Sequence, residues 1–166
     1  MHKDIQEKVY EEISNADSPL KYLEMVLNEA MRLFPVVPFA FRKTQGEVEF
    51  EDMTIPADTN LFISIIHIQR NPLYWGDDAH LFKPERFERE NFEKIHPYAF
   101  MPFTKGPRMC LGWRYAMMLM KIVISNFLRR FEVETTKKFD DIEPQLGCTL
   151  TIHGGYKISI KERHKA

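Results

Sequence analysis

The residues best suited to chemistry in this sequence lie in one short segment, Phe103 to Gly112, around a single cysteine. The segment reads Phe-Thr-Lys-Gly-Pro-Arg-Met-Cys-Leu-Gly and leads directly into a long helical pattern. Backbone N–H groups at a helix start favour negative charge, and Arg108 is close by, so Cys110 is expected to present a thiolate, the form that binds metals. Gly106 allows a backbone conformation that a β-carbon hinders, and Gly112 leaves room for a flat group against the first helical turn.

A cysteine at a helix start is, taken alone, more often a small buried residue than a ligand. The phenylalanine, the two glycines and the arginine around Cys110 favour the ligand interpretation. A third reading is a cysteine nucleophile or zinc site, which requires Cys110 and Cys148 to converge with histidines. The candidates are His67, His96 and His153, but the spacing matches no zinc motif and no CxxC occurs.

A second constellation lies upstream. Glu29 and Arg32 are three residues apart on a strongly apolar helical pattern, so they share one helix face. They form either a solvated i,i+3 pair or a semi-buried pair that needs a third partner. Arg86, in Pro84-Glu85-Arg86-Phe87, can be that partner, because its planar guanidinium matches a carboxylate.

The surrounding pattern predicts the elements that must position these residues. Pro35 ends the second helix, and Gly154-Gly155 is expected to turn a hairpin between strands 150–152 and 156–160. The long helix has a broad apolar face and is expected to be a core helix. The predicted order is a helix pair at 4–34, a β-rich segment at 40–68 with one strand at 60–68, an irregular meander at 70–102, the cysteine loop at 103–112, the long helix at 111–131 and C-terminal β hairpins at 132–163.

Composition narrows the function classes. The 166 residues are enough for one domain, and a formal net charge of −1 gives no signal for nucleic acid. The apolar run at 61–68 is far shorter than the roughly 20 residues that cross a bilayer. Two cysteines make no disulfide scaffold, which favours a reducing setting.

Three motifs in this order resemble the signatures of cytochromes P450, in the style of the microsomal eukaryotic class. They are Glu29-Ala30-Met31-Arg32, Pro84-Glu85-Arg86-Phe87, and Phe103 through Cys110 to Gly112. The resemblance covers nearly the whole chain and implies a fold that is mainly α with small β-sheets, of which this chain is the C-terminal portion. Two positions depart from the family pattern: Thr104 stands where glycine is usual, and Gln69 where histidine is common.

The resemblance implies a role for each motif residue. Cys110 would be the axial ligand to the iron of haem b. Arg42 and Arg108 match positions that pair with the haem propionates, while Phe103 and Gly112 would lie against the macrocycle. Glu29, Arg32 and Arg86 would form a structural triad behind the haem.

The resemblance also implies an activity and partners. A haem-thiolate monooxygenase inserts one oxygen atom from O2 into a lipophilic small molecule, with electrons from an NADPH-dependent reductase that docks on the proximal face. Lys105, Arg114 and Lys121 would lie on that face, or simply form a solvated cationic surface. Family members of this class are found at the endoplasmic reticulum membrane, on its cytosolic side.

Segments 36–41 and 146–149 match parts of the family that line the substrate cavity. Phe39 and Phe41 would make that cavity apolar, although ordinary core packing explains them equally well. By this resemblance the chain would be several-fold shorter than a complete member and would lack the distal oxygen-activating helix. The alternative is therefore a catalytically inactive remnant that binds haem or nothing.

Overall fold

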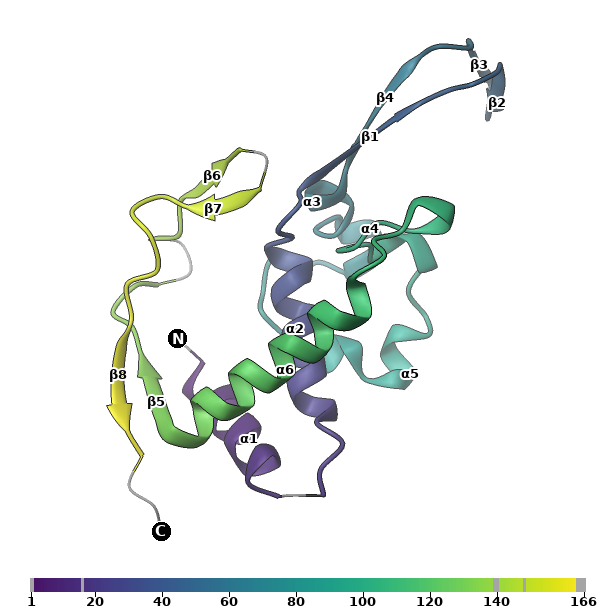
Figure 1. Ribbon diagram of the computed structural model, residues 1–166. Helices are drawn as coiled ribbons and strands as arrows, with labels where there is room; N and C mark the ends of the chain where they lie inside the picture. The colour runs from purple at the N-terminus through teal and green to yellow at the C-terminus, as the bar shows by residue number, and fades with distance from the viewer. Residues whose placement is uncertain (1, 16, 139–140, 148, 164–166) are drawn as a thin grey trace.

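Three long helices form the framework of the molecule. The computed structural model describes residues 2–15, 17–138, 141–147 and 149–163. Helices α1 (Lys3–Ser14), α2 (Lys21–Leu33) and α6 (Trp113–Arg130) lie against one another, with the β segments at the two ends of this layer (Figure 1). The shorter helical turns are α3 (Ile65–Ile68), α4 (Pro72–Trp75), η1 (Pro84–Phe87), α5 (Arg89–Phe92), η2 (Pro97–Ala99) and η3 (Gly106–Arg108).

The described residues form three hydrophobic clusters, of which the two larger lie between the long helices and within the meander. In the first, Val9 and Ile13 of α1 pack against Leu23 and Leu27 of α2 and are covered by apolar residues of α6. The second lies under the meander and comprises Trp75, Ala79, Phe87 and Ala99. The i, i+4 spacing of the α1 residues explains why that helix buries one face only.

The described strands pair in four small antiparallel sheets. β1 (Phe39–Lys43) pairs with β4 (Asn60–Ser64), and β2 (Val48–Phe50) pairs with β3 (Met53–Ile55) at the tip of the same projection (Figure 1). β5 (Phe131–Glu134) pairs with β8 (Ser159–Glu162), and β6 (Pro144–Leu146) with β7 (Leu150–Ile152). The expected fold class, mainly α with small β-sheets, is confirmed.

Two predicted strand arrangements are wrong. The strand expected at 60–68 ends at Ser64 and becomes helix α3, where the N–H of Ile66 donates to the carbonyl of Pro38. The hairpin expected at Gly154-Gly155 does not form. Both glycines have positive φ and turn the chain, but β8 pairs with β5, which directly follows α6. The prediction of a turn at Gly154-Gly155 is correct, but the prediction that the strand after this turn pairs with the strand before it is wrong.

The prediction that α6 is a core helix is also wrong. Among its described side chains only Ser125 is buried, while Met118, Leu119, Ile122 and Val123 are exposed. The face with Met117, Met120, Ile124 and Leu128 packs on α1 and α2. The helix is apolar on both faces, but the described chain covers only one. No helix in the described ranges is long and apolar enough to cross a membrane.

Candidate functional site

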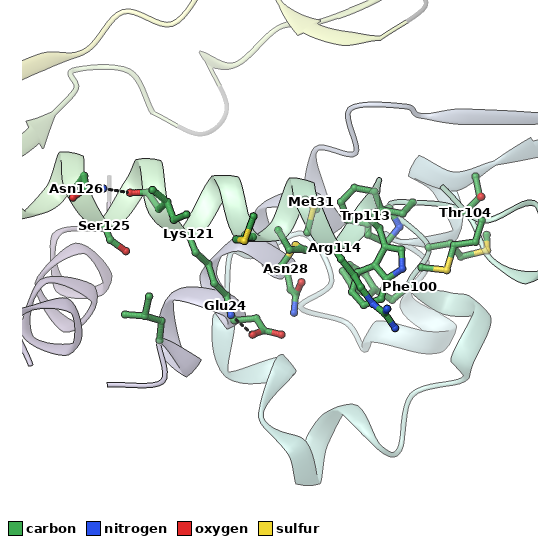
Figure 2. Close-up of a pocket in the computed structure, with 18 of the residues that line it drawn as sticks. Glu24, Asn28, Met31, Phe100, Thr104, Trp113, Arg114, Lys121, Ser125 and Asn126 are labelled. Atoms are coloured by element: carbon green, nitrogen blue, oxygen red, sulfur yellow. Dashed lines mark hydrogen bonds and ion pairs between the residues drawn. The ribbon is translucent and has the colours of Figure 1, made fainter. Parts of the chain in front are cut away.

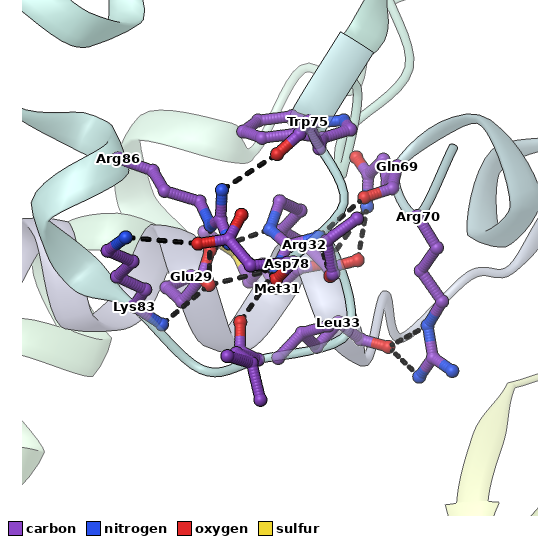
Figure 3. A network of polar contacts seen from close by, with 12 residues as sticks. Glu29, Met31, Arg32, Leu33, Gln69, Arg70, Trp75, Asp78, Lys83 and Arg86 are labelled. Atoms are coloured by element: carbon purple, nitrogen blue, oxygen red, sulfur yellow. Dashed lines mark hydrogen bonds and ion pairs between the residues drawn. The ribbon is translucent and has the colours of Figure 1, made fainter. Parts of the chain in front are cut away.

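The Glu29–Arg32 pair is fully buried, so the alternative of a solvated pair is wrong. Arg32 Nε donates to Glu29 Oε2 at 2.6 Å and Nη2 donates to Oε1 at 2.8 Å, a two-pronged geometry (Figure 3). The remaining donors of Arg32 reach the carbonyls of Gln69, Ala79 and Leu81. All five guanidinium N–H groups are thus used, which is what a charge with no exposed surface requires.

Arg86 joins this pair from η1 as its outer member. Its Nε lies 3.6 Å from Glu29 Oε1, close enough for an ion pair but without a hydrogen bond. Its Nη1 donates to the carbonyl of Trp75, and its Nη2 lies 2.6 Å from Asp78 Oδ1. The structure therefore brings together Glu29, Arg32 and Arg86, the three residues expected to form a triad.

Asp78 and Trp75 are members of this cluster that the sequence analysis missed. Hydrogen bonds from Arg86 and then Lys83 lower the pKa of Asp78 to about 2. The guanidinium of Arg32 lies over the ring of Trp75, 4.9 Å from its centroid. Neither residue stands at a motif position, and only the tertiary fold brings them to the arginines.

The C-terminal turn of α2 is capped by two side chains from a distant segment. Gln69 Nε2 donates to the carbonyls of Met31 and Arg32, and the guanidinium of Arg70 donates to the carbonyl of Leu33 (Figure 3). These carbonyls have no partner within the helix. Burial, with a smaller contribution from the charge of Arg32, lowers the pKa of Arg70.

The cysteine loop is closed by its own hydrogen bonds. The N–H of Cys110 donates to the carbonyl of Phe103 at 2.9 Å, and Thr104 Oγ1 donates to the carbonyl of Arg108 at 3.1 Å. Gly106 has φ +80° and Thr104 has φ +59°, a left-handed conformation that costs a β-branched residue energy. The side-chain hydrogen bond of Thr104 offsets part of that cost and holds the loop shut.

Cys110 itself is exposed, so the alternative of an ordinary buried cysteine is wrong. Leu111, beside it, is fully exposed, and Arg108 is exposed with no ion pair among the described residues. Phe103 is half-buried at the base of the loop. The helix begins at Trp113, with Gly112 as its N-cap. The loop thus presents its cysteine outward.

Arg42 reaches the same end of the molecule through strand β1. It pairs in register with Leu61, and among the described residues its Nη1 donates only to the neighbouring carbonyl of Phe41. Met101, two residues before Phe103, packs with Ala40 of β1 and with Ile65. This contact sets the root of the cysteine loop against the root of the β1–β4 hairpin.

The residues of this face fit a haem group. Gly112 has φ −86°, and a β-carbon there would meet nothing within 4 Å, so neither the backbone nor packing in the described chain requires glycine. This open space would let a flat ring lie against the loop. The donor set is one exposed thiol with two guanidinium groups, Arg42 and Arg108, for carboxylates.

Of the two segments expected to line a substrate cavity, 36–41 bonds to the strand that directly follows 146–149. The N–H of Leu150 donates to the carbonyl of Val36 at 2.8 Å, which ties the β6–β7 turn to the loop after α2. Phe41 is 68% exposed, so core packing does not explain it. Its ring and that of Phe39 both contact Phe62, an exposed aromatic that sequence analysis missed. Residue 148 of the turn lies outside the described residues.

A 780 Å³ groove runs between α2 and α6 beside the cysteine loop. In Figure 2 the Lys121 side chain crosses it to Glu24, with 2.5 Å between Nζ and Oε2. Lys105 donates to the carbonyl of Pro97, while Arg114 is exposed and lies over the ring of Trp113. Of the three cations assigned to this face, the two lysines are held within the chain and Arg114 has no ion pair in the described residues.

The zinc or nucleophile reading finds no support in the described residues. They contain no group of three His, Cys, Asp or Glu side chains that could hold a metal ion. His67 contacts Ser64 Oγ, and His96 accepts from the N–H of Tyr98, so both rings have local partners. Cys148, which that reading also needs, is outside the described residues.

The chain belongs to the cytochrome P450 family, whose model, described as Cytochrome P450, matches residues 1–159. Probable cytochrome P450 313a2 of Drosophila melanogaster is 40% identical over 134 residues, 80% of this chain and 27% of that relative. Probable cytochrome P450 4aa1 of the same organism is 40% identical over 144 residues, 87% of this chain and 28% of that relative.

A mammalian relative is also similar. Lithocholate 6-beta-hydroxylase of Mesocricetus auratus is 34% identical over 151 residues, 84% of this chain and 30% of that relative. The family predicted from the three motifs is confirmed. The chain spans between 27% and 34% of the length of the curated relatives it matches.

Proposed function

We propose that this chain forms the proximal side of a haem-thiolate site, with Cys110 Sγ as the axial ligand to the iron of haem b. The observation that carries the proposal is the exposed cysteine at the end of a closed loop. The hydrogen bond from the Cys110 N–H to Phe103 fixes the backbone, while the sulfur remains accessible. A ligand to an external group needs this combination of a fixed backbone and a free donor atom.

The other loop residues would hold the macrocycle. Arg108 and Arg42 are available to pair with the two propionates, since neither has an ion pair in the described part of the chain. Phe103 would supply an apolar wall, and Gly112 would let the ring approach the first turn of α6. The triad of Glu29, Arg32 and Arg86 would support the loop from behind.

Insertion of one oxygen atom from O2 into an organic molecule, with reduction of the other atom to water, is the chemistry that a thiolate-bound haem supplies when present. The proposed substrate is a lipophilic small molecule. The exposed aromatic side chains of Phe41 and Phe62 support this choice, because they offer an apolar surface beside Arg42. One relative is named for hydroxylating lithocholate, which supports an oxygenation reaction.

Electrons would come from an NADPH-dependent reductase at the proximal face. Of Lys105, Arg114 and Lys121, Arg114 is the exposed cation, and an acidic partner surface would pair with it. Association that weakens with added salt is the expected behaviour. A location at the cytosolic side of the endoplasmic reticulum membrane is part of the same proposal.

A spectrum tests the ligand assignment directly. The full chain is loaded with haem, reduced and exposed to carbon monoxide, and the difference spectrum is recorded. A red-shifted, thiolate-type Soret band is expected for the wild type and for Cys148→Ser, the matched control. Cys110→Ser is expected to abolish that band, because serine cannot supply the electron-rich sulfur. A band that survives in Cys110→Ser refutes the assignment.

A second candidate function is haem binding without turnover. The exposure of Cys110 and Leu111 favours it, because no described side chain covers this face of the loop. Product formation from a lipophilic probe, with reductase and NADPH supplied, separates the two candidates. A thiolate-type spectrum without product supports haem binding alone, whereas product supports the oxygenase.

A further inference from the structure

Gln69 connects the buried network to the cysteine loop. It caps the C-terminus of α3 and its side chain is fully buried. On one side, Nε2 donates to the carbonyls of Met31 at 3.0 Å and Arg32 at 3.2 Å. On the other, Oε1 accepts the N–H of Met101 at 2.8 Å. One amide thus contacts both α2 and the segment that enters the cysteine loop.

The backbone of Gln69 contacts the same network. Its carbonyl accepts a hydrogen bond from Arg32 Nη1 at 2.9 Å, and its N–H donates to Ile65 in α3. The backbone of Gln69 is therefore fixed by the guanidinium of Arg32, and its side chain is fixed by the carbonyls of Met31 and Arg32. A long, flexible side chain fixed this way loses freedom to move, so its Oε1 is a rigid acceptor.

Met101 links Gln69 to the cysteine loop through its backbone. Its N–H goes to Gln69, and its carbonyl accepts from the N–H of Thr104. Thr104 in turn bonds to the carbonyl of Arg108, and Phe103 accepts from the N–H of Cys110. A continuous chain of hydrogen bonds and short backbone links therefore runs from Arg32 through Gln69 to Cys110.

We propose that Gln69 is a positioning residue for the cysteine loop, whose amide sets the entry of the loop relative to α2. The chemistry of glutamine suits this task. Its amide offers two donors and an acceptor together and stays neutral, whereas neutral histidine offers one donor and one acceptor. The importance of Gln69 for function rests on the proposed role of Cys110. The structural coupling between Gln69 and the cysteine loop does not depend on that role.

Amide hydrogen exchange of the full chain without haem tests the coupling. In Gln69→Leu, the amide of Met101 is expected to exchange about tenfold faster, because its acceptor is lost. The amide of Cys110 keeps its acceptor, the carbonyl of Phe103, and is expected to exchange faster because the entry of the loop is loosened. The amide of Ile124 in α6 is expected to change much less. Gln69→His retains an acceptor and is expected to restore protection at Met101. Gln45→Leu, at an exposed glutamine, is the matched control and is expected to leave all these amides unchanged.

Two results would overturn the proposal. One is wild-type exchange at Met101 and Cys110 in Gln69→Leu. The other is equal acceleration at every amide in both Gln69→Leu and Gln69→His, which would assign Gln69 to general stability. Should Gln69→Leu fail to fold, Gln69→Asn, which keeps the amide but shortens its reach, decides by the same amides. Since no haem is added, failure of Cys110 as a ligand would leave this result unchanged.

Discussion

The surroundings of Arg32 and of Cys110 are physically opposite. Every N–H of the Arg32 guanidinium has a partner within the chain, and its side chain has no exposed surface. Around Cys110, Leu111 is fully exposed, Arg108 has no ion pair among the described residues, and a β-carbon at Gly112 would meet no described atom within 4 Å. The guanidinium donors of Arg32 are all satisfied within the chain, whereas the described residues leave the region around Cys110 exposed.

The contrast indicates that the two regions have different roles: the Arg32 cluster is structural, and the Cys110 loop presents side chains to the surface. A rigid, saturated cluster can support a loop from behind without competing for its ligand atoms. The loop is closed by its own backbone hydrogen bonds and leaves Cys110 exposed and Arg108 without an ion pair among the described residues.

The largest expected effect is at Arg32. Arg32→Lys keeps the charge but offers three donors in place of five, and it cannot form the two-pronged bond to Glu29. Loss of roughly 3–5 kcal/mol in the free energy of unfolding is expected, as for other broken buried pairs. Urea unfolding measures it. Arg89→Lys is the control, because the Arg89–Glu93 pair is exposed, and it should change stability by less than about 0.5 kcal/mol. Equal urea midpoints for Arg32→Lys and Arg89→Lys would show that the Arg32 cluster does not contribute more to stability than an exposed ion pair.

A smaller, pH-dependent effect is expected at Asp78. Its pKa is lowered from 3.8 to about 2 in the folded chain, so ionised Asp78 stabilises the fold above about pH 4. That contribution is lost as the pH falls from about 4 towards 2. Asp78→Asn is expected to cost roughly 1 kcal/mol at pH 7, with the partial exposure of the carboxylate taken into account.

The measurement is urea unfolding as a function of pH. The stability difference between wild type and Asp78→Asn should be constant from pH 7 to about 5 and should shrink below pH 4. Asp58→Asn is the matched control, since the Lys43–Asp58 pair is exposed. If Asp78→Asn lowers the free energy of unfolding equally at pH 3 and pH 7, the charge of Asp78 does not stabilise this cluster.

The smallest effect on folding is expected at the exposed face. Leu111→Gln should change the free energy of unfolding by less than about 0.5 kcal/mol, because the side chain makes no buried contact. Leu33→Ala, at a buried leucine, should cost about 2–5 kcal/mol. The same Leu111→Gln variant should retain haem less well, which equilibrium titration measures. Strong destabilisation of the haem-free chain by Leu111→Gln would mean that the loop face is already covered.

Much of the site could be read from residue types and spacing. Glu29 and Arg32 share a helix face because three residues nearly complete a helical turn, and Arg86 follows from a planar group that suits a carboxylate. The cysteine loop was located by its glycines and arginine. The errors concern partners: the strand that pairs with β8, the second face of α6, and Asp78, Trp75 and Gln69 beside the arginines.

The sequence by itself determined which residues carry charge, where the chain must turn and which helix faces are apolar. Only the tertiary structure decided that Arg32 donates to the carbonyls of Gln69, Ala79 and Leu81, and that Gln69 spans from α2 to Met101. Backbone carbonyls and N–H groups are the same in nearly every residue, so no sequence pattern distinguishes the one that will be a partner. Their pairing depends on which distant segments the hydrophobic clusters bring within 3 Å or so of one another.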